Sequence, residues 1–372
     1  MYNSNDSSKI THIAGTFVIS AKGSFLNGAG LGEGEDRNIS IVKTFQDGQY
    51  RIPYVSSQAW KRWLRNTLIE ETNWPQSEIK ALHVNAKGNT DKIGGEFNPI
   101  EYPEDDLFGY MRTEKGSGKT TNEEDESVDV ENGTDVENKV KGKKVKSIMR
   151  KSPFSASILV SLRKTGWKGR DEGFVHLKEG TPQPYTTEFY NTNLQGVFCL
   201  DYNRLGIFSN IGDRIELDES KANAFIQNNK IKIVQNGGKS GNIYEIIDAQ
   251  KYRKERAAKL LESLSKLRGG AKQAAFGTDV SPKILIVAGL SCGNPIFNNI
   301  FTDDGKSFNL DTEILKEIVL DYKDRISTPV FIGIRQGYLT NEQDVKKLEE
   351  YSNVKFIVTT PINAAIEMGK LL

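Results

Sequence analysis

The densest group of chemically useful side chains lies on a helix predicted at residues 55–71. Apolar residues recur there at helical spacing and would form one buried stripe, namely Trp60, Trp63, Leu64, Thr67 and Leu68. The other side carries an amide and three cations, namely Gln58, Lys61, Arg62 and Arg65. Cations at short spacing on a rigid element could bind successive phosphates, and hydroxyls at Ser56 and Ser57 could cap the helix and add donors. A basic helix face is, however, often only a solvent-exposed surface.

Two glycine-rich segments could bring backbone amides close to phosphates. Residues 23–34 (GSFLNGAGLGEG) follow a predicted strand at 13–20 and are expected to form a loop. Residues 269–273 (GGAKQ) follow a second basic helix, predicted at 248–267, and place Lys272 beside flexible glycines. The second segment is equally well explained as a helix stop followed by a turn.

Aromatic residues are concentrated in a long connection between two predicted strands, at 156–162 and 196–202. An ordinary hairpin turn needs only ~2–5 residues, so this length predicts a functional excursion. Trp167, Phe189 and Tyr190 could stack on nucleic-acid bases, which contributes ~1–3 kcal/mol per base without sequence preference. Anchoring of the excursion to the body of the protein explains these aromatics equally well.

The sequence gives weaker support to catalysis. Its three histidines lie near no recognisable nucleophile motif and are expected to be structural or solvated. Glu33, Glu35 and Asp36 could bind a metal ion, although solvated loop carboxylates are the simpler interpretation. Residues 116–120 (GSGKT) resemble the end of a phosphate-binding P-loop, but Thr113 stands where that motif requires glycine. We therefore expect no nucleotide-hydrolysing site.

Bulk composition limits the remaining possibilities. The chain has 372 residues, 37% hydrophobic and 27% charged, which is typical of a globular protein with one elaborated domain or two. A formal charge of +1 means that any nucleic-acid site must be a local stripe. Two distant cysteines outside any CxxC pair, a polar N-terminus and the lack of an apolar run of ~20 residues predict a cytoplasmic protein without a membrane segment.

The predicted elements follow the order strand, helix, strand, strand, helix, strand, and the last strand lies at 283–290. That order is typical of the RNA-recognition-motif, or ferredoxin-like, sheet within an α+β fold. Residues 114–151 are first acidic and then basic, with too little apolar surface to fold, so we expect a mobile insertion. Residues 291–372 add about two helices and two strands, either as an extension of the sheet or as a small domain.

Five short motifs, in one order, resemble those of the DevR-type backbone subunits of type I-B CRISPR Cascade complexes, in the RAMP superfamily. The first is FLNGAGLGEGEDRN followed by YRIPYVSSQAWKRWL at 50–64, where the family typically shows a glycine-rich loop and an SSQ-x-x-K/R-R helix. The others are EDDLFGYMR at 104–112, KSPF at 151–154, EFY at 188–190 with a strand like GVFCLDY soon after, and GGAKQ. Together they cover roughly residues 13–290.

The resemblance implies a hand-shaped subunit with an RNA-recognition-motif palm, a large finger insertion, a long thumb hairpin and a C-terminal α/β extension. The palm would comprise 10–74, 152–163 and 195–290, the fingers and web 75–151, the thumb 164–194, and the extension 291–372. Copies would stack head to tail along a CRISPR guide RNA, and each thumb would displace one base at regular intervals. The implied partners are the guide RNA, target DNA paired to it, neighbouring copies, and the handle-capping, large, small and repeat-processing Cascade subunits. No cofactor, metal or membrane is implied.

The candidate RNA-binding residues lie in or beside these motifs and in the aromatic excursion. They are Lys22, Asn27, Arg37, Ser56, Ser57, Gln58, Lys61, Arg62, Arg65, Arg150, Lys151, Trp167, Phe189, Lys272 and Gln273. A subunit that must accept any spacer should contact phosphates, sugars and shape, because base edges differ from one guide to the next.

Cleavage remains the main alternative to coating. The resemblance implies that related subunits of type III complexes cut RNA with a loop aspartate, and Asp36 lies in a similar loop. The local pattern GEDRN resembles the non-cutting branch, so we expect no enzymatic activity. A metal-dependent ribonuclease that uses Glu33, Glu35 or Asp36 is the alternative. A regulator that binds duplex DNA ranks last, because no helix-turn-helix spacing is visible.

Overall fold

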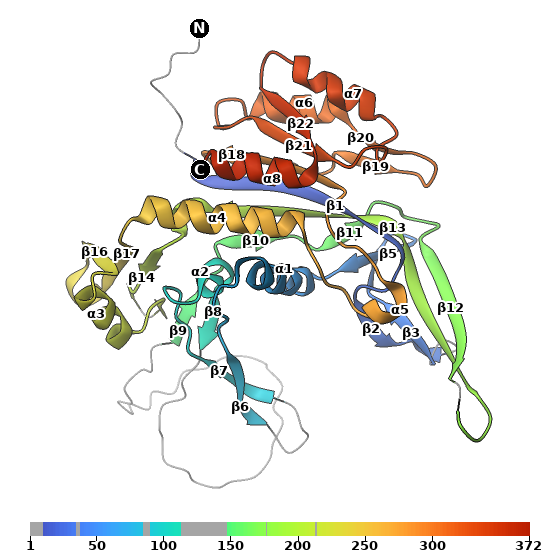
Figure 1. Cartoon of the computed structure of the whole chain (residues 1–372), viewed down its shortest axis with the longest axis horizontal. Coiled ribbons are helices and arrows are strands. Elements are labelled where there is room, and N and C mark those ends of the chain that lie inside the picture. The colour runs from blue at the N-terminus through green and yellow to red at the C-terminus, as the bar shows by residue number, and fades with distance from the viewer. Residues whose placement is uncertain (1–9, 35–37, 85–89, 113–146, 176, 213) are drawn as a thin grey trace, which may run out of the picture.

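The computed structural model describes residues 10–34, 38–84, 90–112, 147–175, 177–212 and 214–372. In these residues the chain folds as a mixed α+β protein, in which one large sheet dominates and the helices are few (Figure 1). The predicted α+β class is therefore confirmed. No helix in this part of the chain is long and apolar enough to cross a lipid bilayer.

The large sheet is formed by twelve of the described strands. Its main path runs in the order β22 (Phe356–Thr359), β21 (Val330–Ile334), β18 (Ile284–Leu290), β1 (His12–Ser24), β13 (Gln183–Asp201), β11 (Leu159–Ser161), β5 (Tyr50–Val55) and β4 (Thr44–Asp47). Four strands pair beside this path, namely β2 (Gly28–Leu31), β3 (Ile39–Val42), β10 (Phe154–Ala156) and β12 (Lys168–Val175). Neighbours on the main path are antiparallel, except β21 and β22, which are parallel.

The six elements predicted from periodicity all occur, and they lie together at the centre of the molecule. The two predicted helices are α1 (Ser57–Thr72) and α4 (Ala249–Ser265), and these contact each other. The strand expected at 156–162 is divided into β10 and β11. The central strands are consecutive neighbours in the order β18, β1, β13 and β11. Local hydrophobic spacing therefore located these elements correctly.

Strand β13 is much longer than the sequence predicted. It is one continuous strand of 19 residues, and the strand expected at 196–202 is only its last part. Its first residues pair with β12, from Lys168 opposite Tyr190 to Val175 opposite Gln183. The aromatic excursion is therefore a two-stranded hairpin, which projects away from the sheet in Figure 1.

Alternation along β1 explains why both faces of the sheet are covered. Phe17 and Ile19 pack into one core with α1, α4 and α8 (Pro361–Lys370), whereas Ala14 and Val18 pack into a second core on the opposite face. The second core is covered by elements after residue 291, namely β19 (Phe301–Asp303), β20 (Phe308–Leu310), α6 (Thr312–Asp321) and α7 (Glu342–Lys346). The C-terminal residues thus extend the sheet through β21 and β22 and also form a layer over it.

The remaining elements belong to the insertions and connections. Those between α1 and β10 are β6 (Ile79–Val84), β7 (Thr90–Gly95), α2 (Pro103–Phe108), β8 (Tyr110–Arg112) and β9 (Ser147–Arg150). Those between β13 and β18 are η2 (Tyr202–Arg204), β14 (Ile207–Ser209), β15 (Arg214–Ile215), α3 (Glu219–Gln227), β16 (Ile231–Asn236), η3 (Gly238–Ser240), β17 (Asn242–Ile246) and α5 (Gln273–Phe276). A short turn, η4 (Lys347–Glu350), follows α7. The lobe formed by α3, β14, β16 and β17 lies at the opposite end of the molecule from the β12–β13 hairpin (Figure 1).

The charged tract predicted at 114–151 lies outside the described residues as far as residue 146. Its final residues differ from the prediction, because they form β9, which pairs with β8 and with β15. The sequence GSGKT at 116–120 also lies outside the described residues.

Candidate nucleic-acid interface

Helix α1 begins at a well-defined cap that also holds the glycine-rich loop. The Ser56 side chain accepts a hydrogen bond from the Ala59 amide, and the Ser56 amide donates to the Asn27 side-chain oxygen, at 3.1 Å. The first turn of α1 contains no acidic residue, so no side chain there neutralises the positive end of the helix dipole. The amide end of a 16-residue helix therefore faces the same region as Ser57 and Gln58.

The segment at 269–277 lies against this helix and loop. The amide of Ala271 donates to the Leu26 carbonyl at 3.0 Å, and Gly269 lies so close to Trp63 that a Cβ there would be 2.3 Å from the indole. Lys272 donates to the Thr187 hydroxyl at 2.8 Å, and its ammonium lies 4.7 Å from the centre of the Phe25 ring. The fold thus brings together the start of α1, the loop after β1, the GGAKQ segment and strand β13 of the hairpin.

Three predicted residues present exposed donors on this surface, namely Gln58, Arg62 and Lys272. Among the described residues, Arg62 has no hydrogen-bond or ion-pair partner. Ser56, Ser57 and Asn27 are partly exposed beside them. A flexible guanidinium, an ammonium, an amide and a helix N-terminus on one surface form a donor set suited to successive phosphates.

Two cations predicted for the same helix face are instead engaged with the protein. The Lys61 ammonium donates to the Ser152 hydroxyl at 3.1 Å and to the Phe154 carbonyl at 3.0 Å, and burial lowers the pKa of this lysine. Arg65 pairs with Glu104 and lies 3.6 Å from Asp105, and its side chain is only 13% exposed. Arg65 therefore joins α1 to α2, and the prediction that it binds phosphate requires correction.

Arg150 requires a stronger correction, because its side chain is wholly buried. It pairs with Asp106 and, at 3.0 Å, with Glu216, and it donates to the Ile207 carbonyl at 2.8 Å. Burial opposes its charge, but the carboxylates of Asp106 and Glu216 outweigh burial and raise the pKa of the guanidinium. Arg150 cannot reach RNA without breaking the core, whereas the neighbouring Lys151 is exposed.

The predicted stacking aromatics hold the hairpin in place. Trp167 is buried, and its indole N–H donates to the Arg51 carbonyl at 2.9 Å. Phe189 is partly buried, covers Gly169 and packs on Phe276 with ring centres 6.0 Å apart. For Trp167 the anchoring interpretation therefore replaces stacking on bases.

The aromatics that the hairpin leaves exposed are ones that the sequence prediction missed. Phe174 is 65% exposed and Tyr185 is 46% exposed. Tyr185 lies over Gly173, the glycine opposite it in the strand pairing. The pairing of Gly169 with Phe189 and of Gly173 with Tyr185 was the available signal, because a cross-strand glycine lets a ring lie flat on the backbone.

The other predicted residues are dispersed. Lys22 is exposed opposite Asn191 in the β1–β13 ladder, on the face that also carries Asn193, so it lies on the side of the C-terminal layer rather than of α1. Gln273 donates to the Gly269 carbonyl and closes the turn of its own segment. Arg37 lies outside the described residues.

Of the three acidic candidates for metal binding, the structure describes one. Glu33 is exposed, and Glu35 and Asp36 lie outside the described residues. In the part of the chain that the structure describes, no three His, Cys, Asp or Glu residues are grouped so that they could hold a metal ion.

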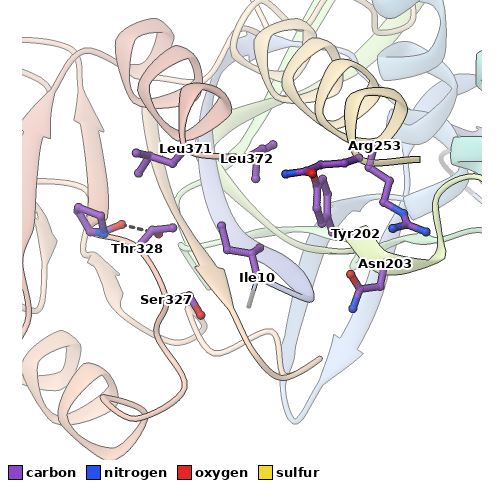
Figure 2. Close-up of a pocket in the computed structure, with 10 residues that line it drawn as sticks. Ile10, Tyr202, Asn203, Arg253, Ser327, Thr328, Leu371 and Leu372 are labelled. Atoms are coloured by element: carbon purple, nitrogen blue, oxygen red, sulfur yellow. Dashed lines mark hydrogen bonds between the residues drawn. The ribbon is translucent and has the colours of Figure 1, made fainter. Parts of the chain in front are cut away.

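A hollow of about 560 Å³ lies away from this surface, between the start of β1, α4 and the last residues of the chain (Figure 2). Ile10, Tyr202 and Leu372 contribute apolar lining. Its cation, Arg253, already pairs with Glu245 at 2.8 Å and donates to the Leu205 carbonyl at 3.0 Å. The hollow therefore presents no row of cations for a phosphate backbone.

Comparison with known proteins identifies one family. Residues 34–306 match the family model described as "CRISPR-associated negative auto-regulator DevR/Csa2". No curated protein matches the sequence. The fold resembles a solved chain from "CRISPR RNA-guided surveillance complex, pre-nicking", with a TM-score of 0.52 and 11% identity over 97% of this chain and 100% of that chain. A chain from "CRISPR RNA-guided surveillance complex" matches with a TM-score of 0.48 and 11% identity over the same shares of both chains.

Proposed function

We propose that this chain, which belongs to the DevR/Csa2 family of CRISPR-associated proteins, binds guide RNA as a repeated backbone subunit of a type I-B Cascade-like complex. The observation that carries the proposal is the grouping of Gln58, Arg62, Lys272 and the α1 N-terminus beside strand β13 of the projecting hairpin. The family match and the likeness in fold to a surveillance-complex chain support the same assignment.

The chemistry of this surface favours the RNA backbone over particular bases. Arg62 and Lys272 supply charge, and the start of α1 supplies amides, all of which suit phosphate oxygens. Such contacts are independent of sequence and weaken steeply with salt. The guide would then provide specificity by pairing with target DNA, while the protein holds its backbone.

The arrangement of elements supports a division of labour within the subunit. We assign the palm to β18, β1, β13 and β11 with α1 and α4, the fingers to the insertion at 75–151, and the thumb to the β12–β13 hairpin. Copies would stack head to tail on one guide in the cytoplasm of a prokaryotic cell, alongside other Cascade subunits. A heterologous contact of this kind generates an open filament when its rotation does not close.

We further propose that the chain does not cut RNA. The alternative, a metal-dependent ribonuclease that uses Glu33, Glu35 or Asp36, predicts cleavage that needs Mg²⁺ or Mn²⁺ and disappears in Asp36→Ala. Labelled RNA complementary to the bound guide, incubated with the metal and separated on a gel, should remain intact. Metal-dependent products that Asp36→Ala abolishes would establish the nuclease in its place.

Single-stranded RNA binding by the purified chain tests the coating function. We expect affinity for unrelated RNA sequences to be similar and to fall steeply between low and physiological salt. The double variant Arg62→Glu, Lys272→Glu should lose about 100-fold in affinity at low salt and lower the salt slope by about 2, since each lost phosphate contact lowers it by about 1.

The matched control is Lys355→Glu, which reverses an exposed cation on the C-terminal layer. It should bind RNA as the unmodified chain does, and all variants should keep the same melting temperature. Equal affinity of the double variant and the control would refute the site. Preference for duplex DNA without any guide would instead favour the regulatory role that the family description mentions.

A further inference from the structure

A buried carboxylate of the C-terminal layer contacts both ends of the hairpin. Asp303, at the end of β19, has a side chain that is 1% exposed. It accepts a hydrogen bond from Arg163 Nε at 2.9 Å and another from the Asn193 side-chain amide at 2.8 Å. Arg163 and Asn193 flank the hairpin excursion at its two ends, so one carboxylate holds both of its roots.

Further contacts complete this clamp, which we define as Asp303, Arg163, Asn193 and Tyr338. The Tyr338 hydroxyl donates to the Asn193 side-chain oxygen at 2.6 Å, and its ring packs edge-on against Phe308, 5.6 Å away. Burial raises the pKa of Tyr338 to about 12, so its hydroxyl remains a donor at physiological pH. Arg163 also donates to the Asn191 carbonyl at 3.3 Å, on the hairpin strand itself.

Two physical properties indicate that the clamp fixes the direction in which the hairpin leaves the sheet. A two-stranded ribbon twists easily when it leaves a sheet, so the pairing of β12 with β13 does not by itself fix the direction of the hairpin. A buried carboxylate is costly without donors, and the Gly305 amide of its own turn supplies Asp303 with only one, at 2.9 Å. The two side-chain donors, Arg163 and Asn193, reach Asp303 only when both ends of the hairpin lie where they do. The carboxylate therefore favours one direction of exit.

We propose that Asp303 is a positioning residue: the C-terminal layer uses it to set the direction in which the β12–β13 hairpin leaves the sheet, and so the spacing at which successive copies engage RNA. The second half of this inference rests on the proposed function. On this proposal, the layer after residue 291, which lies on the face of the sheet opposite α1, serves to orient the hairpin.

Distance measurement tests the first half directly. One spin label is attached through Leu177→Cys, near the tip of the hairpin, and the other through Lys251→Cys on α4; both positions are exposed. The substitution Cys292→Ser removes the more accessible of the two native thiols. Asp303→Ala should shift and broaden the distance distribution. Asp304→Ala is the matched control, because this exposed neighbour only holds the β19–β20 turn through the Lys306 and Ser307 amides. Identical distributions for both variants and the parent would overturn the proposal.

RNA binding tests the second half. Asp303→Ala should bind a short RNA that holds one copy as the parent does, but should lose about tenfold on a long RNA that holds several, the size expected from one charge-assisted contact. Equal losses on both RNAs would overturn the role in spacing. If Asp303→Ala does not fold, Tyr338→Phe removes only the hydroxyl that orients Asn193 and should give a smaller change of the same kind.

The two proposals fail in different ways. A parent protein that binds no RNA but whose hairpin distances change in Asp303→Ala would refute the coating function and retain the positioning role. A parent that coats RNA normally and is unaffected by Asp303→Ala would refute the positioning role alone.

Discussion

Arg62 and Arg65 are one helical turn apart on α1, yet one side chain is exposed and the other is paired within the protein. Arg62 is exposed, with no ion-pair partner in the described part of the chain, whereas Arg65 pairs with Glu104 and is 13% exposed. Both are cations on the polar side of one helix. What separates them is a run of carboxylates on α2, some forty residues later in the sequence, which the fold places against Arg65. Between these two arginines, the position of acidic partners thus decides which guanidinium stays exposed.

The paired cations belong to a buried network that joins three parts of the chain. Arg65, Arg150 and Arg256 converge on the acidic run of α2, and Asp106 lies between the last two. Arg256 stacks on Tyr252 with its guanidinium 3.4 Å from the ring centre. Charges buried this deeply require partners, because the unpaired forms are strongly destabilising. This region therefore joins the insertion to α1 and α4, whereas Arg62 on α1 keeps an exposed guanidinium.

The largest expected effect distinguishes the two regions by stability. Arg150→Ala leaves Asp106 and Glu216 buried without their main cation, so the free energy of unfolding should fall by about 3–5 kcal/mol. Urea unfolding followed by tryptophan fluorescence measures this change. Lys151→Ala, at the exposed neighbouring position, is the control and should change stability by less than about 0.5 kcal/mol. An Arg150→Ala variant as stable as the control would contradict the network.

An intermediate effect compares the two arginines of α1. Arg65→Ala should lower the free energy of unfolding by about 2–3 kcal/mol, since Glu104 and Asp105 lose their cation, and should leave RNA affinity unchanged. Arg62→Ala should do the reverse, with stability within about 0.5 kcal/mol and RNA affinity lower by about tenfold. Parallel denaturation and RNA titration separate the two. An Arg65→Ala variant that is as stable as the parent but binds RNA more weakly would show that Arg65 contacts RNA and does not stabilise the fold.

The smallest effect concerns pH. Burial raises the pKa of Asp105 from 3.8 to about 6, against the opposing influence of hydrogen bonding and of Arg65. Between about pH 4 and 6, Asp105 thus holds a proton in the folded state that it has released in the unfolded chain. The free energy of unfolding therefore falls as pH rises through that window, by at most about 1.4 kcal/mol per pH unit. Below the window the effect is absent, and above it the cost is constant.

Asp105→Asn removes this titration and nearly preserves the shape of the side chain. Its stability should therefore fall less than that of the parent between pH 4 and 6, and the two curves should run parallel above pH 7. Thermal melts at closely spaced pH values make the comparison. Identical slopes in the parent and the variant across this window would show that Asp105 titrates normally.

The sequence located the elements whose formation depends on local spacing. The stripes of α1 and α4 and the alternating residues of β1 and β18 were found because burial on one or two faces leaves a periodic pattern. The proximity of Lys272 to the start of α1 followed from the family resemblance, and in the structure both segments contact the loop after β1.

What the sequence did not reveal depends on contacts between distant residues. Nothing near Arg150 indicates that Asp106 and Glu216 will surround it, and the basic run before it suggested an exposed tract. Trp167 likewise gave no sign that the Arg51 carbonyl would accept its indole proton. The continuity of β13 was obscured because its hairpin half is partly polar and exposed, unlike the buried half in the sheet.

The RNA that accompanies the protein in cells tests the central claim most directly. A tagged chain would be purified from cells that carry a CRISPR array, treated with nuclease, and its protected RNA sequenced, alongside the Arg62→Glu, Lys272→Glu variant. We predict short RNAs of uniform length, each with one spacer and flanking repeat fragments, in the parent and their loss in the variant. A random sample of cellular RNA, or the same guides in both proteins, would contradict the account.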